Sequence, residues 1–414
     1  MSRQRTLYGQ QPLDQWTAEV THAFPNLSKP QATGLAWWSF GMVLARSCAL
    51  TTVAFFLAKL LVVRVGTLCQ RLREFYQEAG AKSGRKRGRK RQHVEVATCF
   101  GPLLRWLLRD WPHQQLAVAL DASTLGERFT VLCLSVVYRG GAIPVAWKIM
   151  PALRKGSWKE PWLALLAQFQ GIVPAGWTVI VLGDRGLWAK WLFEGIRHLG
   201  WHPLLRINQG GTFRPQGWVH FVPLARLVAT RGSRWRGRGT AFATPAAQLE
   251  CTLWAFWGEG HAEAWLLLTD LPPGGGDATW YGLRSWIEQF FKDCKRGGWQ
   301  WQRTRMTDPA RAERLWLAIA VATLWLVRVG GTEEEAQPTV PVRQLRVLPG
   351  DGGERPRARR WRLVSVFQQG WTRIVVTLLQ HGRLPLGRWL PEPWPVVPEG
   401  PEPTAANASQ QRVA

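Results

Sequence analysis

Residues 115–138 read QLAVALDASTLGERFTVLCLSVVY, and this stretch decides the fold class. It holds two apolar runs of strand length, 115–120 and 128–138, separated by a short polar segment. A third apolar run, 142–150, follows directly after Arg-Gly-Gly. Because connections this short leave no room for a crossover helix, the three runs predict an antiparallel sheet.

After residue 150 the pattern alternates between helix and strand. We predict a helix over 159–171, a strand over 176–182, a helix over 187–199 and a strand over 203–208, with crossovers to these later strands. Residues 210–271 carry short runs punctuated by glycine and predict a β-rich insertion. Helices are then expected over 279–296, 309–329 and 364–379. These patterns predict an α/β fold with a mixed sheet and flanking helices.

The N-terminal 80 residues show helical spacing of apolar residues, with a break expected at Arg46-Ser47. The apolar stretch 47–65 is interrupted by Lys59 and Arg64, and its uninterrupted runs fall short of the roughly 18 residues that a membrane span needs. A buried helix is therefore favoured and no membrane partner is expected. Residues 82–91 hold seven basic residues and no acid, which predicts a solvated arm.

The composition favours a nucleic-acid partner. Lys and Arg total 53 against 28 Asp and Glu, so the formal charge is +25, while 46% hydrophobic residues predict a globular chain. This surplus favours phosphate contact by the basic arm over a merely solvated loop. The six cysteines lie far apart without Cys-x-x-Cys spacing, which argues against zinc or disulfides and for a cytoplasmic protein. Residues 391–414 are expected to be disordered.

Three acids stand where metal chemistry would need them. Asp121 and Asp184 are each expected to end a strand, and Glu288 lies on the 279–296 helix. On a helical wheel, Glu288 shares an arc of about 60° with Tyr281, Arg284 and Lys295. Three carboxylates suit a site with two Mg²⁺ ions that cleaves phosphodiesters. The alternatives are turn chemistry for the two aspartates and an ordinary solvated face with i,i+4 ion pairs for the helix.

The pattern Tyr281-x2-Arg284-x3-Glu288-x6-Lys295 resembles the Y-R-E-K signature of bacterial DDE transposases of the insertion sequence 4 family. LDAST at 120–124 and LGDRG at 182–186 are similar to the first- and second-aspartate motifs of that family. The resemblance covers about 114–330. It implies an RNase H-like catalytic domain, interrupted by a β-rich insertion and preceded by a helical DNA-binding domain.

This layout divides the chain into five parts. We expect a helical DNA-binding domain over 1–95 that includes the arm, a first part of the catalytic core over 96–209, the insertion over 210–275, a second part of the core over 276–330 and a basic, Pro-rich region over 331–414.

The resemblance implies a metal site and a set of DNA contacts. Asp121, Asp184 and Glu288 would be catalytic and would bind two Mg²⁺ ions, which Mn²⁺ can replace. The expected DNA-binding residues are Tyr281, Arg284, Lys295, Arg206 and Lys292, with Arg85, Lys86, Arg87, Arg89, Lys90 and Arg91 of the arm. Relatives hold a flipped base on a tryptophan of the insertion, for which the candidates are Trp254, Trp257 and Trp265.

The implied reaction is cleavage at the inverted-repeat ends of an insertion sequence, followed by joining of the 3′-hydroxyls to target DNA. The partners would be double-stranded DNA and a second copy of the chain, in the bacterial nucleoid. The alternative is a catalytically silent DNA-binding descendant that occupies the transposon ends.

Overall fold

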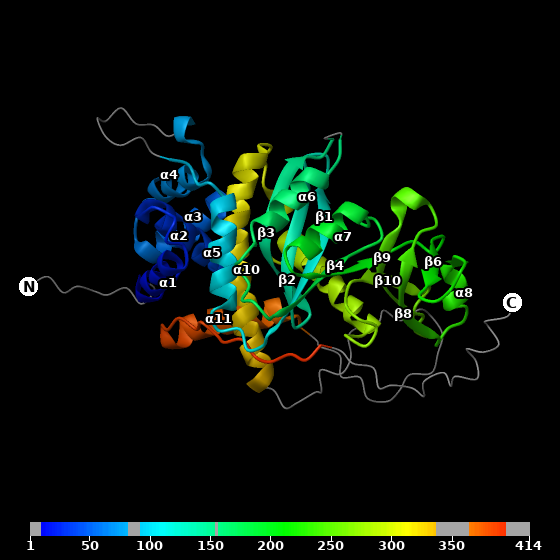
Figure 1. Cartoon of the computed structure of the whole chain (residues 1–414). Coiled ribbons are helices and arrows are strands. Elements are labelled where there is room, and N and C mark those ends of the chain that lie inside the picture. The colour runs from blue at the N-terminus through cyan, green and yellow to red at the C-terminus, as the bar shows by residue number, and fades with distance from the viewer. Residues whose placement is uncertain (1–9, 82–91, 154–155, 337–363, 395–414) are drawn as a thin grey trace, which may run out of the picture.

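The computed structural model describes residues 10–81, 92–153, 156–336 and 364–394. The N-terminal helices α1 (Gln10–Ala23), α2 (Lys29–Ala45), α3 (Leu50–Leu61), α4 (Val65–Tyr76) and α5 (Ala97–Leu108) gather at one end of the molecule (Figure 1). The expected break after α2 is present, since Arg46 adopts a left-handed conformation with φ 47°. A second left-handed residue, Val62, ends α3 after 12 residues. The basic arm 82–91 lies outside the described residues.

The predicted mixed sheet is confirmed. Strands β1 (Gln115–Leu125), β2 (Phe129–Tyr138) and β3 (Gly141–Pro151) pair antiparallel, as their short connections require. Helices α6 (Lys159–Ala167) and α7 (Lys190–His198) are the crossovers to β4 (Thr178–Gly183) and β5 (His202–Arg206). Both of these strands are parallel to β1.

The β-rich segment continues the same sheet and does not form one of its own. It contains β6 (Thr212–Pro215), β7 (Val222–Pro223), the short α8 (Leu224–Leu227), β8 (Arg234–Ala241), β9 (Leu249–Phe256) and β10 (Trp265–Thr269). Because β10 pairs with β5, the ten strands run in the order β3-β2-β1-β4-β5-β10-β9-β8-β6-β7. The segment thus forms the end of the sheet farthest from the N-terminal helices (Figure 1).

The segment expected as one helix over 279–296 is helical, but it is not one regular α-helix. The chain forms a 3₁₀ segment, η3 (Ala278–Ser285), then the α-helix α9 (Trp286–Lys292), then a π turn, η4 (Asp293–Gly297). Lys295 departs from helical geometry, with φ −92° and ψ −119°. Over eight residues an apolar pattern cannot distinguish a period of 3.0 from one of 3.6, so the sequence indicated a helix without its type.

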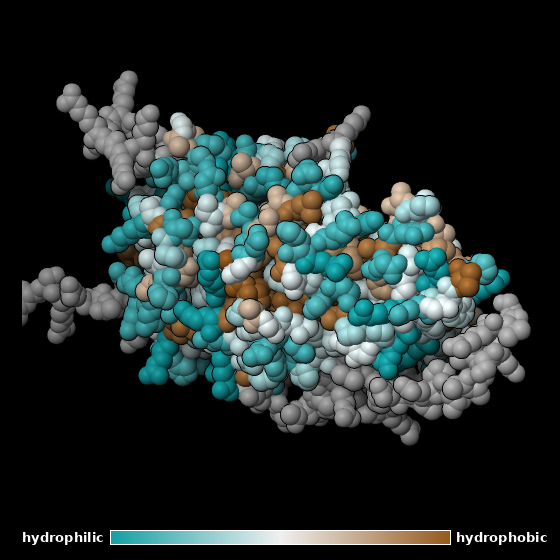
Figure 2. All heavy atoms as spheres, in the orientation of Figure 1, coloured by the Kyte–Doolittle hydropathy of each residue, from teal (hydrophilic) through white to brown (hydrophobic). Residues whose placement is uncertain are grey.

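Helix α10 (Pro309–Ala336) lies in the middle of the molecule, against α11 (Val366–His381), β3 and α2. It is long and apolar enough to cross a membrane, but 89% of its apolar window is buried inside the protein. Helices α2 and α3 are long and apolar enough to cross a membrane only when taken together, and the chain bends by 92° between them. On the face in Figure 2, hydrophobic residues form separate patches among hydrophilic ones.

Candidate active site

The sheet places Asp121 beside Asp184. The parallel pairing of β1 with β4 ends at Ala119 and Leu182, so each aspartate lies two residues beyond the last pair. Asp184 follows the end of β4, as expected. Asp121 does not end its strand, because β1 continues to Leu125 and Asp121 pairs with Cys133 of β2. The polar residues 122–124 obscured this continuation in the sequence.

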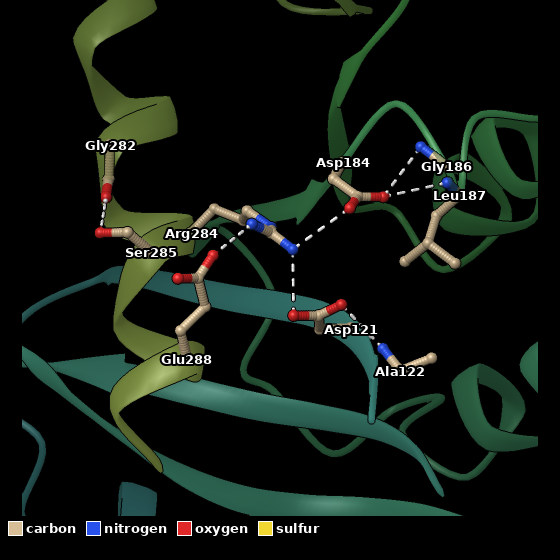
Figure 3. Close-up of polar contacts among 9 residues, drawn as sticks. All are labelled: Asp121, Ala122, Asp184, Gly186, Leu187, Gly282, Arg284, Ser285 and Glu288. Carbon is tan, nitrogen blue, oxygen red and sulfur yellow. Dashed lines mark hydrogen bonds and ion pairs between the residues drawn. The ribbon is translucent and has the colours of Figure 1, made fainter. Parts of the chain in front are cut away.

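The guanidinium of Arg284 joins the three acids (Figure 3). Its Nη2 lies 3.0 Å from Asp121 Oδ2 and 3.3 Å from Asp184 Oδ2. Its Nη1 lies 2.8 Å from Glu288 Oε1. The side chain of Arg284 is only 15% exposed, whereas that of Glu288 is 49% exposed. The i,i+4 pair considered from the sequence is therefore present, but its arginine also pairs with both aspartates, so it belongs to a partly buried cluster and is not an ordinary pair on a solvated face.

The other two members of the signature reach the same region. Lys295 donates from Nζ to Ser123 Oγ at 3.0 Å, and Ser123 lies two residues from Asp121 on β1. Tyr281 is buried and packs against Trp265, with ring centroids 5.2 Å apart. Because the predicted helix is broken, tertiary packing and not a shared helical arc brings these side chains together.

Burial and charge determine the ionisation of this cluster. Burial raises the pKa of Asp121; Arg284 opposes this shift, while the carboxylates of Asp184 and Glu288 add to it. Burial alone would lower the pKa of Arg284. The negative charges around it, that of Asp121 above all, raise this pKa by more than burial lowers it, so the net shift is upward. Burial also raises the pKa of Tyr281 to about 12. Tyr281 therefore keeps its hydroxyl proton at neutral pH, and the hydroxyl can donate a hydrogen bond to an acceptor.

The donor set fits a hard cation. As the side chains stand, no group of three His, Cys, Asp or Glu residues within the described ranges is placed to hold one metal ion. The three carboxylates instead surround one cationic guanidinium, so the cluster is already arranged around positive charge. Carboxylate oxygens are the ligands that Mg²⁺ prefers. Asp121, Asp184 and Glu288 could therefore hold metal where Arg284 now lies.

Two further described basic residues are predicted to contact DNA: Arg206 on β5 and Lys292 on α9, the helix that carries Glu288. Arg206 ends β5 and donates to Glu263 Oε2 at 3.0 Å, and its charge partly opposes the rise in the pKa of Tyr281. Lys292 is exposed on α9. The six arm residues lie outside the described ranges. Glu263 also pairs with Arg185 at 2.8 Å and so links the LGDRG motif to Arg206. No local sequence signal identifies Glu263.

The structure corrects one of the three tryptophan candidates. Trp254 is 2% exposed and packs edge-on against Trp280, so neither of its faces is open to a base. Trp257 is half-buried and donates from Nε1 to the carbonyl of His261. Trp265 is half-buried and stacks on His261, with ring centroids 4.1 Å apart. The sequence alone leaves Trp254 among the candidates, because the residue pattern of β9 does not show that η3 packs over this part of the sheet.

Asp293 is a buried acid that the sequence did not single out. It is 4% exposed at the start of η4 and accepts from Gln289 Nε2 at 3.0 Å. Burial raises its pKa to about 7, against the opposing effects of that hydrogen bond and of Arg46 and Lys292. The folded protein therefore retains a proton that the unfolded chain has already lost, and stability decreases as the pH rises from about 4 through 7.

Asp293→Asn is expected to remove this pH dependence while keeping the hydrogen bond from Gln289. At pH 8 the variant should be more stable than the wild type by a few kcal/mol, and at pH 4 the two should be nearly equal. Urea unfolding at both pH values measures this, with the exposed Asp14→Asn as the control. A stability difference that is the same at both pH values would contradict the assignment.

Comparison with known proteins relates part of the chain to a described protein family. Residues 153–325 match the model of a family described as transposase DDE domain. This range includes Asp184, Arg284 and Glu288, whereas Asp121 precedes it. No curated protein matches the chain. Among solved structures, a cryo-EM structure of a piggyBac transposase synaptic complex with hairpin DNA aligns over 86% of each chain, at 9% identity and a TM-score of 0.34. That similarity is too low to carry an argument.

Proposed function

We propose that this protein is a DNA transposase of the DDE type, similar to the insertion sequence 4 family, that cuts at the inverted-repeat ends of its element and joins the 3′-hydroxyls to target DNA. The observation that carries the proposal is the convergence of Asp121, Asp184 and Glu288 on Arg284. The match of 153–325 to a transposase DDE domain supports it. A structural ion-pair cluster alone would not need an acid from each of three separated segments.

The fold of β1–β5 supports an RNase H-like core within this proposal. Three antiparallel strands followed by two parallel strands with helical crossovers form the mixed sheet that the resemblance implies. Asp121 lies on β1, Asp184 directly follows the adjacent strand β4, and Glu288 reaches both from α9. We assign DNA binding to the N-terminal helices and to the arm 82–91.

In this mechanism Asp121, Asp184 and Glu288 would hold two Mg²⁺ ions. The chemistry that such ions would supply is activation of the attacking hydroxyl and stabilisation of the leaving oxygen. Because Arg284 now bonds one oxygen of each of these carboxylates, its guanidinium would have to turn away for them to hold metal. It would then offer its donors to a phosphate, to which arginine can bind in bidentate fashion.

Tyr281 and Lys295 complete the proposed phosphate contacts. The Tyr281 hydroxyl stays protonated and can donate a hydrogen bond to a phosphate oxygen. Lys295 is positioned beside the site by Ser123. We also propose that two copies of the chain hold the two ends of the element, in the bacterial cytoplasm.

The alternative is a silent DNA-binding descendant, and one assay separates the two. The protein is incubated with DNA that carries the sequence flanking its own gene, in Mg²⁺, in Mn²⁺ and in EDTA. We expect specific nicks at the 3′ ends of the element in either metal and none in EDTA. Specific binding without cleavage in both metals would favour the silent descendant, and the three carboxylates would then be a relic.

A further inference from the structure

A second basic site lies at the far end of the sheet. Strands β6, β8 and β9 enclose a groove of about 610 Å³ together with the ends of β10 and α7. The part of the molecule that holds it, around β6, β8 and α8, is opposite the N-terminal helices in Figure 1. Its charged and aromatic lining residues are Arg197, Arg214, Trp218, Arg238, Glu250 and Asp270.

The arginines of this groove differ in their partners. Arg197 pairs with Asp270, which is also hydrogen bonded to His202. Arg214 donates to Thr240 Oγ1 at 3.3 Å and lies over the ring of Phe221. Arg238 is exposed on β8. Among the residues that the structure describes, no acid pairs with Arg214 or Arg238. Glu250 supplies one negative charge in the groove and accepts from the Thr240 hydroxyl.

The guanidinia of Arg214 and Arg238, neither of which pairs with an acid of the described residues, lie on neighbouring strands and on one face of the sheet. Arg214 of β6 pairs with Thr240 of β8, and Arg238 is two residues from Thr240 along the same strand. Residues that pair directly, or that are two apart on one strand, point to the same side. Both arginines therefore project from the same face.

This face is the one that carries the candidate active site. Asp121 lies on the same face of β1 as Ala119, which precedes it by two residues. From Ala119, steps between directly paired residues, or between residues two apart on one strand, stay on that face and lead across the sheet to Arg238. The residues on this path are Ala119, Leu182, Leu204, Arg206, Leu267, Trp254, Arg236 and Arg238. From β4 to β8 this path crosses four strand spacings, or roughly 19 Å. At 3.4 Å per base pair, that distance corresponds to about six base pairs of duplex.

We propose that the groove of Arg214 and Arg238 binds the phosphodiester backbone of DNA at a distance from the cleaved bond, as a sequence-independent anchor. The inference rests on the proposed function, because it takes the ligand at the active site to be DNA. Arginine suits the task because it cannot lose its charge and offers a planar fork of donors to phosphate oxygens. Each phosphate contact releases counterions, which makes binding sensitive to salt.

The test is the salt dependence of DNA binding by Arg214→Gln/Arg238→Gln. Fluorescence anisotropy is measured in EDTA, so that no cleavage interferes, on a 40-base-pair duplex that carries the flanking sequence of the gene. Two lost phosphate contacts should reduce the slope of log K against log[salt] by about 2 and weaken binding roughly tenfold at moderate salt. Arg238→Gln alone, an exposed change that disturbs no packing, should reduce the slope by about 1.

The matched control is Arg226→Gln/Arg231→Gln, which removes the same charge from the same end of the sheet. Both of these residues are exposed and neither lines the groove. Equal slopes for the groove and control variants, or an unchanged slope for Arg238→Gln, would overturn the anchor while leaving the transposase proposal intact. If the wild type bound no DNA at all, the proposed function would fail, and the anchor with it.

Discussion

Asp121→Asn is expected to reduce strand cleavage by about 10³-fold or more, a barrier increase of about 4 kcal/mol. Asparagine keeps the shape of the side chain, and its carbonyl can still accept from the backbone N–H of Ala122, as Asp121 Oδ1 does at 2.8 Å. It cannot supply the anionic oxygen that a hard cation requires. The loss should therefore affect the chemical step and leave the protein folded.

Two measurements check this expectation. Initial rates of nicking in Mg²⁺ report the reaction, and anisotropy in EDTA reports DNA affinity, which should stay within about twofold of the wild type because the basic surface is unchanged. Glu127→Gln is the control, since Glu127 is an exposed acid in the turn between β1 and β2. A variant that cleaves at the wild-type rate would exclude Asp121 from the reaction. A variant that loses DNA binding would show that Asp121 has a structural role.

Arg284→Gln is expected to produce two separate effects. Without divalent ions, three neighbouring carboxylates lose their shared cation, and the free energy of unfolding should fall by about 2–4 kcal/mol, somewhat less than for a fully buried ion pair. With Mg²⁺, the same carboxylates are no longer occupied by a guanidinium, so ions bind without displacing it and the lost stability should return. Cleavage should still fall about 10²-fold because a phosphate contact is missing.

Thermal unfolding in EDTA and across a Mg²⁺ titration measures the first two effects. Arg328→Gln is the control: Arg328 is 12% exposed and pairs at 2.7 Å with Asp110, which is not one of the three site acids. This variant should also lose stability, but Mg²⁺ should not restore it. If Mg²⁺ raised the melting temperature of wild type, Arg284→Gln and Arg328→Gln by the same amount, Arg284 would not compete with metal for the carboxylates.

Local patterns predicted most of the framework. The three apolar runs between 115 and 150 correspond to β1, β2 and β3, and the later alternation corresponds to α6, β4, α7 and β5. Antiparallel and parallel pairing followed from the length of each connection, because a short connection cannot cross over the sheet. The residue types and spacing of the Y-R-E-K pattern also indicate Glu288 and Arg284 as site residues.

Other features depended on contacts between distant segments. The ion pair of Arg284 with Asp121 joins residues 163 positions apart, and no local pattern encodes it. The burial of Trp254 results from η3 packing over β9, and the groove of Arg214 and Arg238 exists only because β6 pairs with β8.

The sequence by itself therefore determined the order and type of most elements, the basic character of the chain and the residues that could carry the chemistry. The tertiary structure alone decided that Asp121 lies inside a strand, that the predicted helix after residue 278 is broken, that the insertion extends the main sheet, and that a guanidinium lies among the three acids. The physical reason is range. Hydrophobic periodicity and turn chemistry act over a few residues, whereas register, burial and charge pairing are determined by which distant segments pack together.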